Sequence, residues 1–120
     1  MAMFEIKNFL QPDETRKFEG AGQAEVVMMA GRPVGRGIFE PGWRWSTNVK
    51  PIAGTDLCEV SHLGYCQSGH MRIILSDGTA KEISPGDVVA IPPGHDAEVV
   101  GDETCVLLDF GEIAEYAKRS

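Results

Sequence analysis

The sequence lacks long apolar runs and clusters of basic residues, and each absence argues against one class of function. No stretch approaches the roughly eighteen consecutive apolar residues of a membrane-spanning helix, and the first residues show no secretory leader. The formal net charge is −7, and the eleven Lys and Arg residues form no patch along the chain. Phosphate binding needs clustered cations, which argues against a nucleic-acid partner. We therefore expect a cytoplasmic protein that binds neither membranes nor nucleic acids.

Cysteines are few, and the common catalytic fingerprints are missing. The three cysteines are an odd number and none lies in a Cys-x-x-Cys pair. In a reducing compartment this indicates free thiols or a metal ligand rather than a disulfide framework. The sequence contains no nucleophile elbow, Walker loop or dinucleotide fingerprint. Its three histidines are too widely spaced for a zinc motif carried on one helix.

Turn residues divide the chain into short apolar segments. The 120 residues suffice for one domain, and the fourteen glycines and seven prolines are scattered rather than clustered. About nine short strands separated by turn signals predict an all-β sandwich or barrel. We expect an irregular or partly helical lead-in over residues 1–22, the barrel over 23–111, and a short C-terminal helix over 112–120.

The segment 43–49 alternates in a way that favours a strand. Trp43, Trp45, Thr47 and Val49 share one parity, so a strand would place them on one face. The two indoles could form an aromatic wall for a ligand. An apolar core face or a dimer contact accounts for them equally well.

The segment 58–66 also alternates, and it contains side chains that can bind a metal ion. Cys58 and His62 share one parity, together with Cys66 near the end of the segment. Two residues four apart on a straight strand are about 13 Å from each other, too far for one ion. One ion could bind both only if the chain bends between Cys58 and His62, which would bring both side chains to the barrel interior opposite His95.

Two linked stretches resemble the motifs of the cupin superfamily. Gly86, Pro92 and Gly94 match the spacing of the second cupin motif, and Gly69 matches the glycine that closes the first. The resemblance covers most of residues 41–100, with further similarity to small bacterial cupins that carry Cys-x3-His and Pro-Pro-Gly-His-Asp signatures. It implies a jelly-roll β-barrel.

The metal ligands that the resemblance implies depart from the common cupin set. The usual His-x-His falls on residues 56–58, so that Cys58 replaces the second histidine. The glutamate position falls on His62, and the last histidine position falls on Ala97, two residues after His95. The predicted set is therefore Cys58, His62 and His95, with Asp56 as a further ligand or neighbour. Two imidazoles and a thiolate suit Zn²⁺ best and leave a coordination position open. The alternative is a buried apolar cysteine with two histidines in ordinary hydrogen bonds.

Other polar residues carry weaker predictions. Arg36 and Arg44 could bind a carboxylate inside the barrel or form surface salt bridges. Asp96 and Glu98 have the opposite parity to His95 and should face away from it, and His70 should be exposed.

These patterns predict a metal-binding cupin, with zinc as the metal and a small polar molecule as the ligand inside the barrel. A small barrel has sheet edges that need cover, so we expect a homodimer in which residues 24–40 could reach a neighbour. No general base lies beside the ligands in the sequence, which leaves catalysis open. The alternatives are a metal-free binding or sensory module and a metal-free sugar-type epimerase or isomerase.

Overall fold

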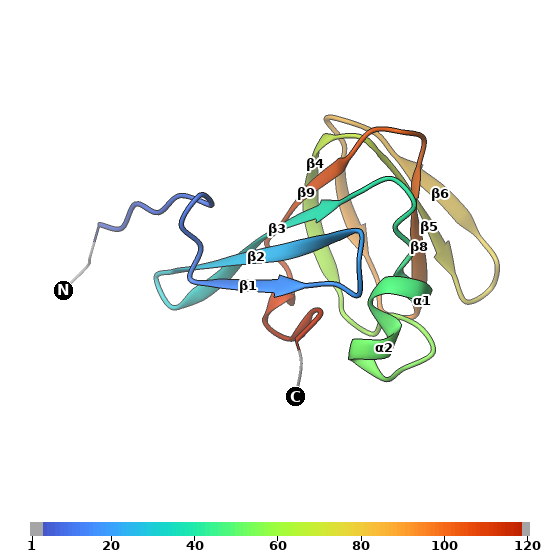
Figure 1. Ribbon diagram of the computed structural model, residues 1–120, viewed down its shortest axis with the longest axis horizontal. Coiled ribbons are helices and arrows are strands. Elements are labelled where there is room, and N and C mark those ends of the chain that lie inside the picture. Colours follow the sequence, from blue (N-terminus) through green and yellow to red (C-terminus); the bar gives the residue numbers. More distant parts are fainter. Residues whose placement is uncertain (1–3, 119–120) are drawn as a thin grey trace.

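The computed structural model describes residues 4–118, and within them the chain forms two antiparallel sheets that curve into a barrel (Figure 1). Hairpins and longer crossovers bring the strands of the larger sheet together out of chain order. That sheet has the order β1 (Glu14–Lys17), β2 (Gly22–Met29), β3 (Arg32–Phe39), β9 (Cys105–Asp109), β4 (His62–Ser68), β7 (Val88–Ile91). The smaller sheet has the order β6 (Ala80–Ile83), β5 (His70–Leu75), β8 (His95–Val100). The expectation of an all-β jelly roll is confirmed.

Strands β4, β5 and β8 alternate between inward and outward side chains. On β4, Gly64 and Cys66 are buried while Leu63 and Tyr65 are exposed. On β8, His95 and Ala97 are buried, and Asp96 between them is more exposed. The interior of the barrel is thus lined by one parity of each strand, as a period of two residues requires.

Aromatic side chains fill one end of the barrel. The rings of Phe39 and Trp43 have centroids 4.5 Å apart, and Phe18 stacks on Phe39 at 5.4 Å. Tyr116 meets Phe18 edge-on at 6.2 Å. The aromatic cluster therefore joins β1–β3 to the C-terminal segment.

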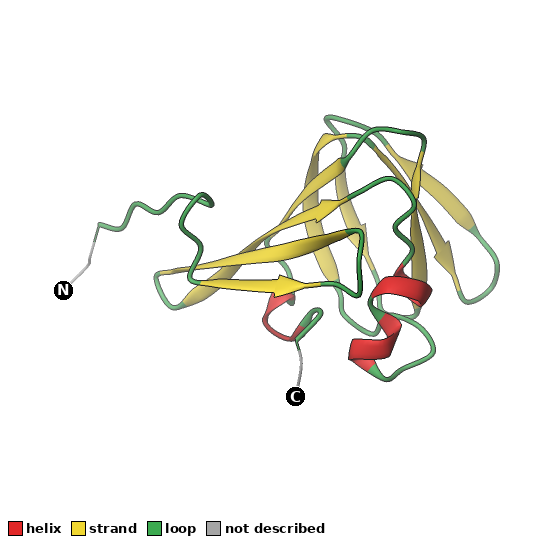
Figure 2. Cartoon of the chain, in the orientation of Figure 1, coloured by secondary structure: helices red, strands yellow, loops and turns green. Residues whose placement is uncertain are grey.

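The predicted strand over residues 43–49 is wrong. Trp43 and Arg44 do pair with β8, through Val99 N donating to Trp43 O at 2.9 Å and a bridge between Arg44 and Glu98. The chain then turns into two short helices, α1 (Trp45–Asn48) and α2 (Lys50–Ala53), drawn in red in Figure 2. Trp45 and Val49 are four residues apart, a spacing that places both on one face of a helix as well as of a strand.

The two ends of the described chain depart from the predicted boundaries. The lead-in contains the strand β1, and the described residues before it, from Phe4 onwards, extend away from the barrel (Figure 1). At the other end, the helix predicted over residues 112–120 is a single 3₁₀ turn, η1 (Ile113–Glu115), and residues 119 and 120 lie outside the described part. No helix within residues 4–118 combines the length and apolar character that crossing a membrane requires.

A buried arginine joins these two ends. The Arg16 guanidinium donates through Nη1 to the carbonyl oxygens of Ile113 and Tyr116, both at 2.8 Å, and pairs with Glu14 at 2.6 Å. The backbone of the C-terminal turn is thereby fixed against β1, with the Tyr116 side chain buried beneath it.

Candidate metal centre

Backbone pairing places Cys58 beside His95. Cys58 N donates to His95 O at 2.8 Å, and Gly94 N donates to Cys58 O at 2.7 Å. The two residues form an isolated antiparallel bridge, in which directly opposed side chains project to the same side. Both residues are buried. The proline-rich turn before His95 thus sets the position of its imidazole next to the thiol.

His62 reaches the same point from the other sheet. It is the first residue of β4 and pairs with Ile91 of β7, whereas Cys58 pairs with β8 of the smaller sheet. The chain bends between them, as expected, and Cys58 Sγ lies 3.6 Å from His62 Nε2. The ring centroids of His62 and His95 are 5.3 Å apart.

The three side chains have the spacing of a metal site. One ligand atom from each of Cys58, His62 and His95 lies within 4.8 Å of the others. Bond lengths of zinc to sulfur and nitrogen in tetrahedral geometry place two donors on one ion about 3.3–3.6 Å apart. The contact between Cys58 and His62 already has this spacing, and about 1 Å of side-chain movement closes the rest. These donors therefore fit a tetrahedral ion with one further ligand.

Each histidine has its Nδ1 engaged, which leaves Nε2 for a metal. His95 Nδ1 lies 2.7 Å from the carbonyl oxygen of Pro92, which can only accept, so this nitrogen carries the proton. His62 Nδ1 lies 2.5 Å from Asp109 Oδ2. Such partners fix the orientation of metal-bound histidines and increase their basicity. Both rings are thus held in the tautomer that ligation requires.

The contact between Cys58 and His62 shifts both pKa values. Burial opposes the thiolate, but the hydrogen bond with His62 and the neighbouring imidazole of His95 outweigh it and lower the pKa of Cys58 from 9.0 to about 7. Burial likewise opposes the imidazolium, but the hydrogen bond to Asp109 and the one to Cys58 raise the pKa of His62 from 6.5 to about 9. Without an ion the two groups therefore form a thiolate–imidazolium pair near neutral pH. Metal binding replaces the proton of that imidazolium.

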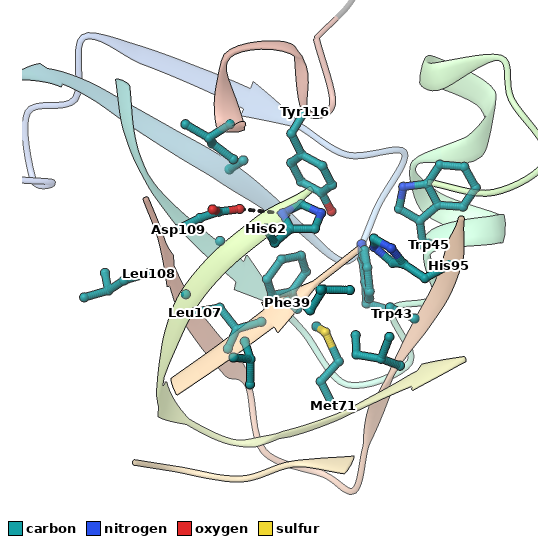
Figure 3. Close-up of a pocket in the computed structure, with 18 residues that line it drawn as sticks. Phe39, Trp43, Trp45, His62, Met71, His95, Leu107, Leu108, Asp109 and Tyr116 are labelled. Carbon is teal, nitrogen blue, oxygen red and sulfur yellow. Dashed lines mark hydrogen bonds and ion pairs between the residues drawn. The ribbon is translucent and has the colours of Figure 1, made fainter. Parts of the chain in front are cut away.

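A small cavity lies beside the two histidines. Its volume is about 50 Å³, and His62 and His95 line it together with Trp43, Trp45 and Tyr116 (Figure 3). The remaining lining is mostly apolar, from residues such as Phe39, Met71, Ile73 and Leu107. A fourth ligand on an ion at this site would occupy the cavity.

Tyr116 is a further polar residue beside His62 in the cavity lining, in addition to Asp109. Its ring meets the imidazole edge-on, with centroids 5.2 Å apart. Complete burial, together with the negative charges of Cys58 and Asp109, holds the pKa of its phenol well above the ordinary 10.0. The hydroxyl therefore keeps its proton at neutral pH.

The structure removes Asp56 from the candidate ligands. Its carboxylate is almost fully exposed and lies 3.4 Å from Lys50 Nζ, on the loop that precedes Cys58. The residues just before Asp56 are exposed as well, so this carboxylate points into solvent and not towards Cys58. His70 is exposed, as predicted, and contacts Ser84 at 3.2 Å. Cys66 lies deeper along β4, where its thiol donates to the carbonyl oxygens of Ser68 and Gly69.

Several charged residues outside the cavity form ion pairs. Arg44 and Arg72 both bind Glu98, and Arg36 pairs with Glu25 at 2.8 Å. Asp96 accepts a hydrogen bond from Ser46 N at 3.1 Å, facing α1. Of the two alternatives for the arginines, the salt bridges are the ones observed.

Asp109 and Tyr116 are parts of the site that the sequence analysis missed. Asp109 is the one carboxylate in the otherwise apolar strand Cys105–Asp109, a signal that could have singled it out. Tyr116 gives no such signal, because its position depends on the turn at Ile113 and on Arg16.

Comparison with known proteins identifies the fold. No protein-family model matches this sequence, and no curated protein matches it as a relative. Among solved structures, an RmlC-like cupin from Shewanella frigidimarina is 18% identical with a TM-score of 0.63, over 94% of this chain and 95% of that one. The polyketide cyclase RemF from Streptomyces resistomycificus is 18% identical with a TM-score of 0.64, over 89% of this chain and 78% of that one.

A larger enzyme contains a similar unit. An oxalate decarboxylase variant from Bacillus subtilis is 17% identical with a TM-score of 0.60, over 93% of this chain and 31% of that one. These neighbours span different named proteins, and their sequences share little with this one. What they have in common is the architecture, and this chain has the cupin jelly-roll fold.

Proposed function

We propose that the protein binds one Zn²⁺ ion through Cys58, His62 and His95 and holds a small polar molecule beside it. The observation that carries the proposal is the convergence of these three donors with both Nδ1 atoms already engaged. Thiolate and imidazole ligands in tetrahedral geometry are characteristic of zinc. Three protein ligands leave the fourth position to water or to a ligand, as in catalytic zinc sites.

Other residues around the site would orient the ligands and bind the small molecule. A zinc ion with an open position activates water or polarises a carbonyl, which would suit hydrolase, lyase or isomerase chemistry. Asp109 holds His62 in the ligating tautomer. The Tyr116 hydroxyl keeps its proton at the cavity and can donate a hydrogen bond to a bound molecule. The apolar lining excludes water from the rest of the space.

Metal analysis of protein purified without a histidine tag, under reducing conditions, tests the proposal. We expect stoichiometric zinc in the native protein and none in either His62→Ala or His95→Ala. His70→Ala is the matched control and should retain full metal content, because this histidine is exposed on β5. Full occupancy in both site variants, or no metal in the native protein, would contradict the site.

A metal-free binding module is the second candidate, and one observation favours it. The side chains of Cys58, His62 and Asp109 are already joined by hydrogen bonds, with His62 3.6 Å from Cys58 and 2.5 Å from Asp109. A thiolate–imidazolium pair anchored by a carboxylate satisfies these groups without an ion. Under this alternative the native protein contains no metal but still binds its ligand in the cavity.

We also propose that the protein is a homodimer. The larger sheet ends at β1 and β7, which are its edge strands. Strands β2 and β3, which cover most of the segment expected to reach a neighbour, lie inside the sheet. At the β7 edge, Val88 of β7 and Leu63 of the neighbouring strand β4 are exposed, and the N-terminal segment carries the exposed side chains of Phe4, Ile6 and Leu10. A second copy would cover both groups, since apolar surface next to a free strand edge favours association.

Sedimentation of the protein at micromolar concentration should show a dimer. Val88→Asp should shift it towards monomer by placing a charge on the β7 edge, while leaving the metal content unchanged. A native protein that sediments only as a monomer would rule the dimer out.

A further inference from the structure

Two buried hydrogen-bond donors in the cavity have no acceptor. Trp43 and Trp45 are each 2% exposed, and within residues 4–118 their Nε1 atoms are the buried side-chain nitrogens and oxygens that lack a partner. An indole N–H can only donate, and a buried donor without an acceptor is destabilising. Both tryptophans line one cavity. Their pairing therefore calls for an acceptor that occupies this cavity.

The two donors face the candidate metal centre. In Figure 3 the nitrogen of each indole is turned towards the part of the cavity where His62, His95 and Tyr116 lie. An acceptor there would lie beside the open position of an ion held by the two histidines. Tyr116 lines the same cavity.

The cavity also limits the size and the character of its occupant. A volume of about 50 Å³ holds on the order of four water molecules, or a molecule of similar size. Asp109 also lines the cavity, but its carboxylate already accepts from His62 Nδ1 and from Gly111 N. The remaining lining comes mostly from apolar side chains such as Phe39, Met71 and Ile91, with no Lys or Arg among the described residues. The occupant thus combines oxygen acceptors at one end with a short apolar skeleton.

We propose that the cavity binds a small monocarboxylate with one oxygen on the metal and the other accepting hydrogen bonds from Trp43 and Trp45. The oxygen on the metal rests on the proposed zinc site, whereas the hydrogen bonds to the indoles rest on the unpaired donors alone. A carboxylate fits because zinc with the Cys58 thiolate and two neutral imidazoles carries a net positive charge. A neutral amide of the same shape offers one acceptor oxygen and no compensating charge.

Nuclear magnetic resonance of the ¹⁵N-labelled protein tests this directly. The sequence contains two tryptophans, so both indole N–H signals come from the site, and Trp43→Phe and Trp45→Phe assign them. Propionate is titrated into the zinc-loaded and the metal-free protein, with propionamide as the matched neutral probe. We expect propionate to move both indole proton signals downfield, saturably, with propionamide at least about tenfold weaker in the zinc-loaded protein. Each Trp→Phe variant should weaken propionate binding by about tenfold.

The outcomes separate this inference from the zinc proposal. If the protein binds no zinc but propionate still moves both indole signals, the donors bind the carboxylate and only the metal proposal fails. If zinc binds and neither indole signal moves at saturating propionate, this inference is wrong while the metal site stands. Equal responses to propionate and propionamide in the zinc-loaded protein would overturn the assignment to a carboxylate. The native protein supplies all of these readings, so they hold even if a variant fails to fold.

Discussion

Replacing Asp109 by asparagine should weaken zinc binding without removing a ligand. Asp109 Oδ2 accepts from His62 Nδ1 at 2.5 Å, and its Oδ1 accepts from Gly111 N at 2.8 Å. The side chains of Asp109 and His62 are each 13% exposed, so solvent screens their interaction little. Asparagine keeps the size and one acceptor oxygen but loses the charge. The pKa of His62, now about 9, should fall towards or below its ordinary 6.5, because burial then opposes the cation with less compensation.

The size of the effect follows from the role of such partners at metal sites. Removing a hydrogen-bonded carboxylate behind a histidine ligand costs about 10–100-fold in metal affinity, or about 1.4–2.7 kcal/mol. We expect Asp109→Asn to lose zinc affinity within this range, measured by competition with a chromophoric chelator under reducing conditions. Asp96→Asn is the matched control: Asp96 adjoins His95 in β8 but accepts from Ser46 N. Its zinc affinity should stay at the native value.

The reasoning is refuted if Asp109→Asn is folded and binds zinc as tightly as the native protein. In that case the short contact with His62 does not support the ligand, and Asp109 only fixes the turn at Gly111. A loss of the same size in Asp96→Asn would also refute it, since the effect would then reflect general destabilisation.

Three further predictions test the site and the fold. In the metal-free protein, the ultraviolet absorbance of a thiolate should appear as the pH rises through about 7, from Cys58, and His62→Asn should raise that pKa towards 9.0 because its hydrogen bond is lost. Gly69→Ala should destabilise the protein by at least about 2 kcal/mol more than Gly78→Ala in chemical denaturation. Both glycines have positive φ, +71° and +88°, but a Cβ on Gly69 would lie 2.5 Å from a backbone carbon of β9, while Gly78 faces open space. Arg16→Met should cost about 3 kcal/mol, since two buried carbonyls of the C-terminal turn lose their donor.

For each of these three predictions, one experimental outcome would contradict it. The thiolate signal can be assigned because burial raises the pKa of Cys66, and burial with the neighbouring Cys66 raises that of Cys105 to about 12. No thiolate between pH 6 and 8 would mean that the histidines do not stabilise it. Equal destabilisation in the two glycine variants would show that only the backbone conformation matters. Native stability in the arginine variant would mean that the C-terminal turn is held by packing alone.

The barrel was predictable because its signals are local. Alternation along residues 62–66 and turn chemistry such as Asp77-Gly78 correspond to β4 and to the β5–β6 hairpin. The convergence of Cys58, His62 and His95 was predictable, because the cupin spacing placed Cys58 and His62 in register; their role as metal ligands stays a prediction. Their approach to 3.6 Å required a bend that alternation alone does not describe.

The features that the sequence did not predict depend on contacts between distant segments. Trp45 and Val49 fit two periodicities, and the helix was decided by how α1 packs against β8, with Asp96 accepting from Ser46 N. Asp109 and Tyr116 meet His62 through β9 and the turn that follows it. Such neighbours are fixed by the closure of the barrel, which no window of sequence contains.

The crossing of the chain between the sheets at residues 58–62 has a consequence for unfolding. Cys58 is paired with the smaller sheet and His62 belongs to the larger one, so an ion bound to both would fasten the two halves of the barrel. The halves could not separate without releasing it. Free zinc at a hundred times its dissociation constant would then add about 2.7 kcal/mol to the free energy of unfolding. The melting temperature of the protein would therefore follow the zinc concentration around it.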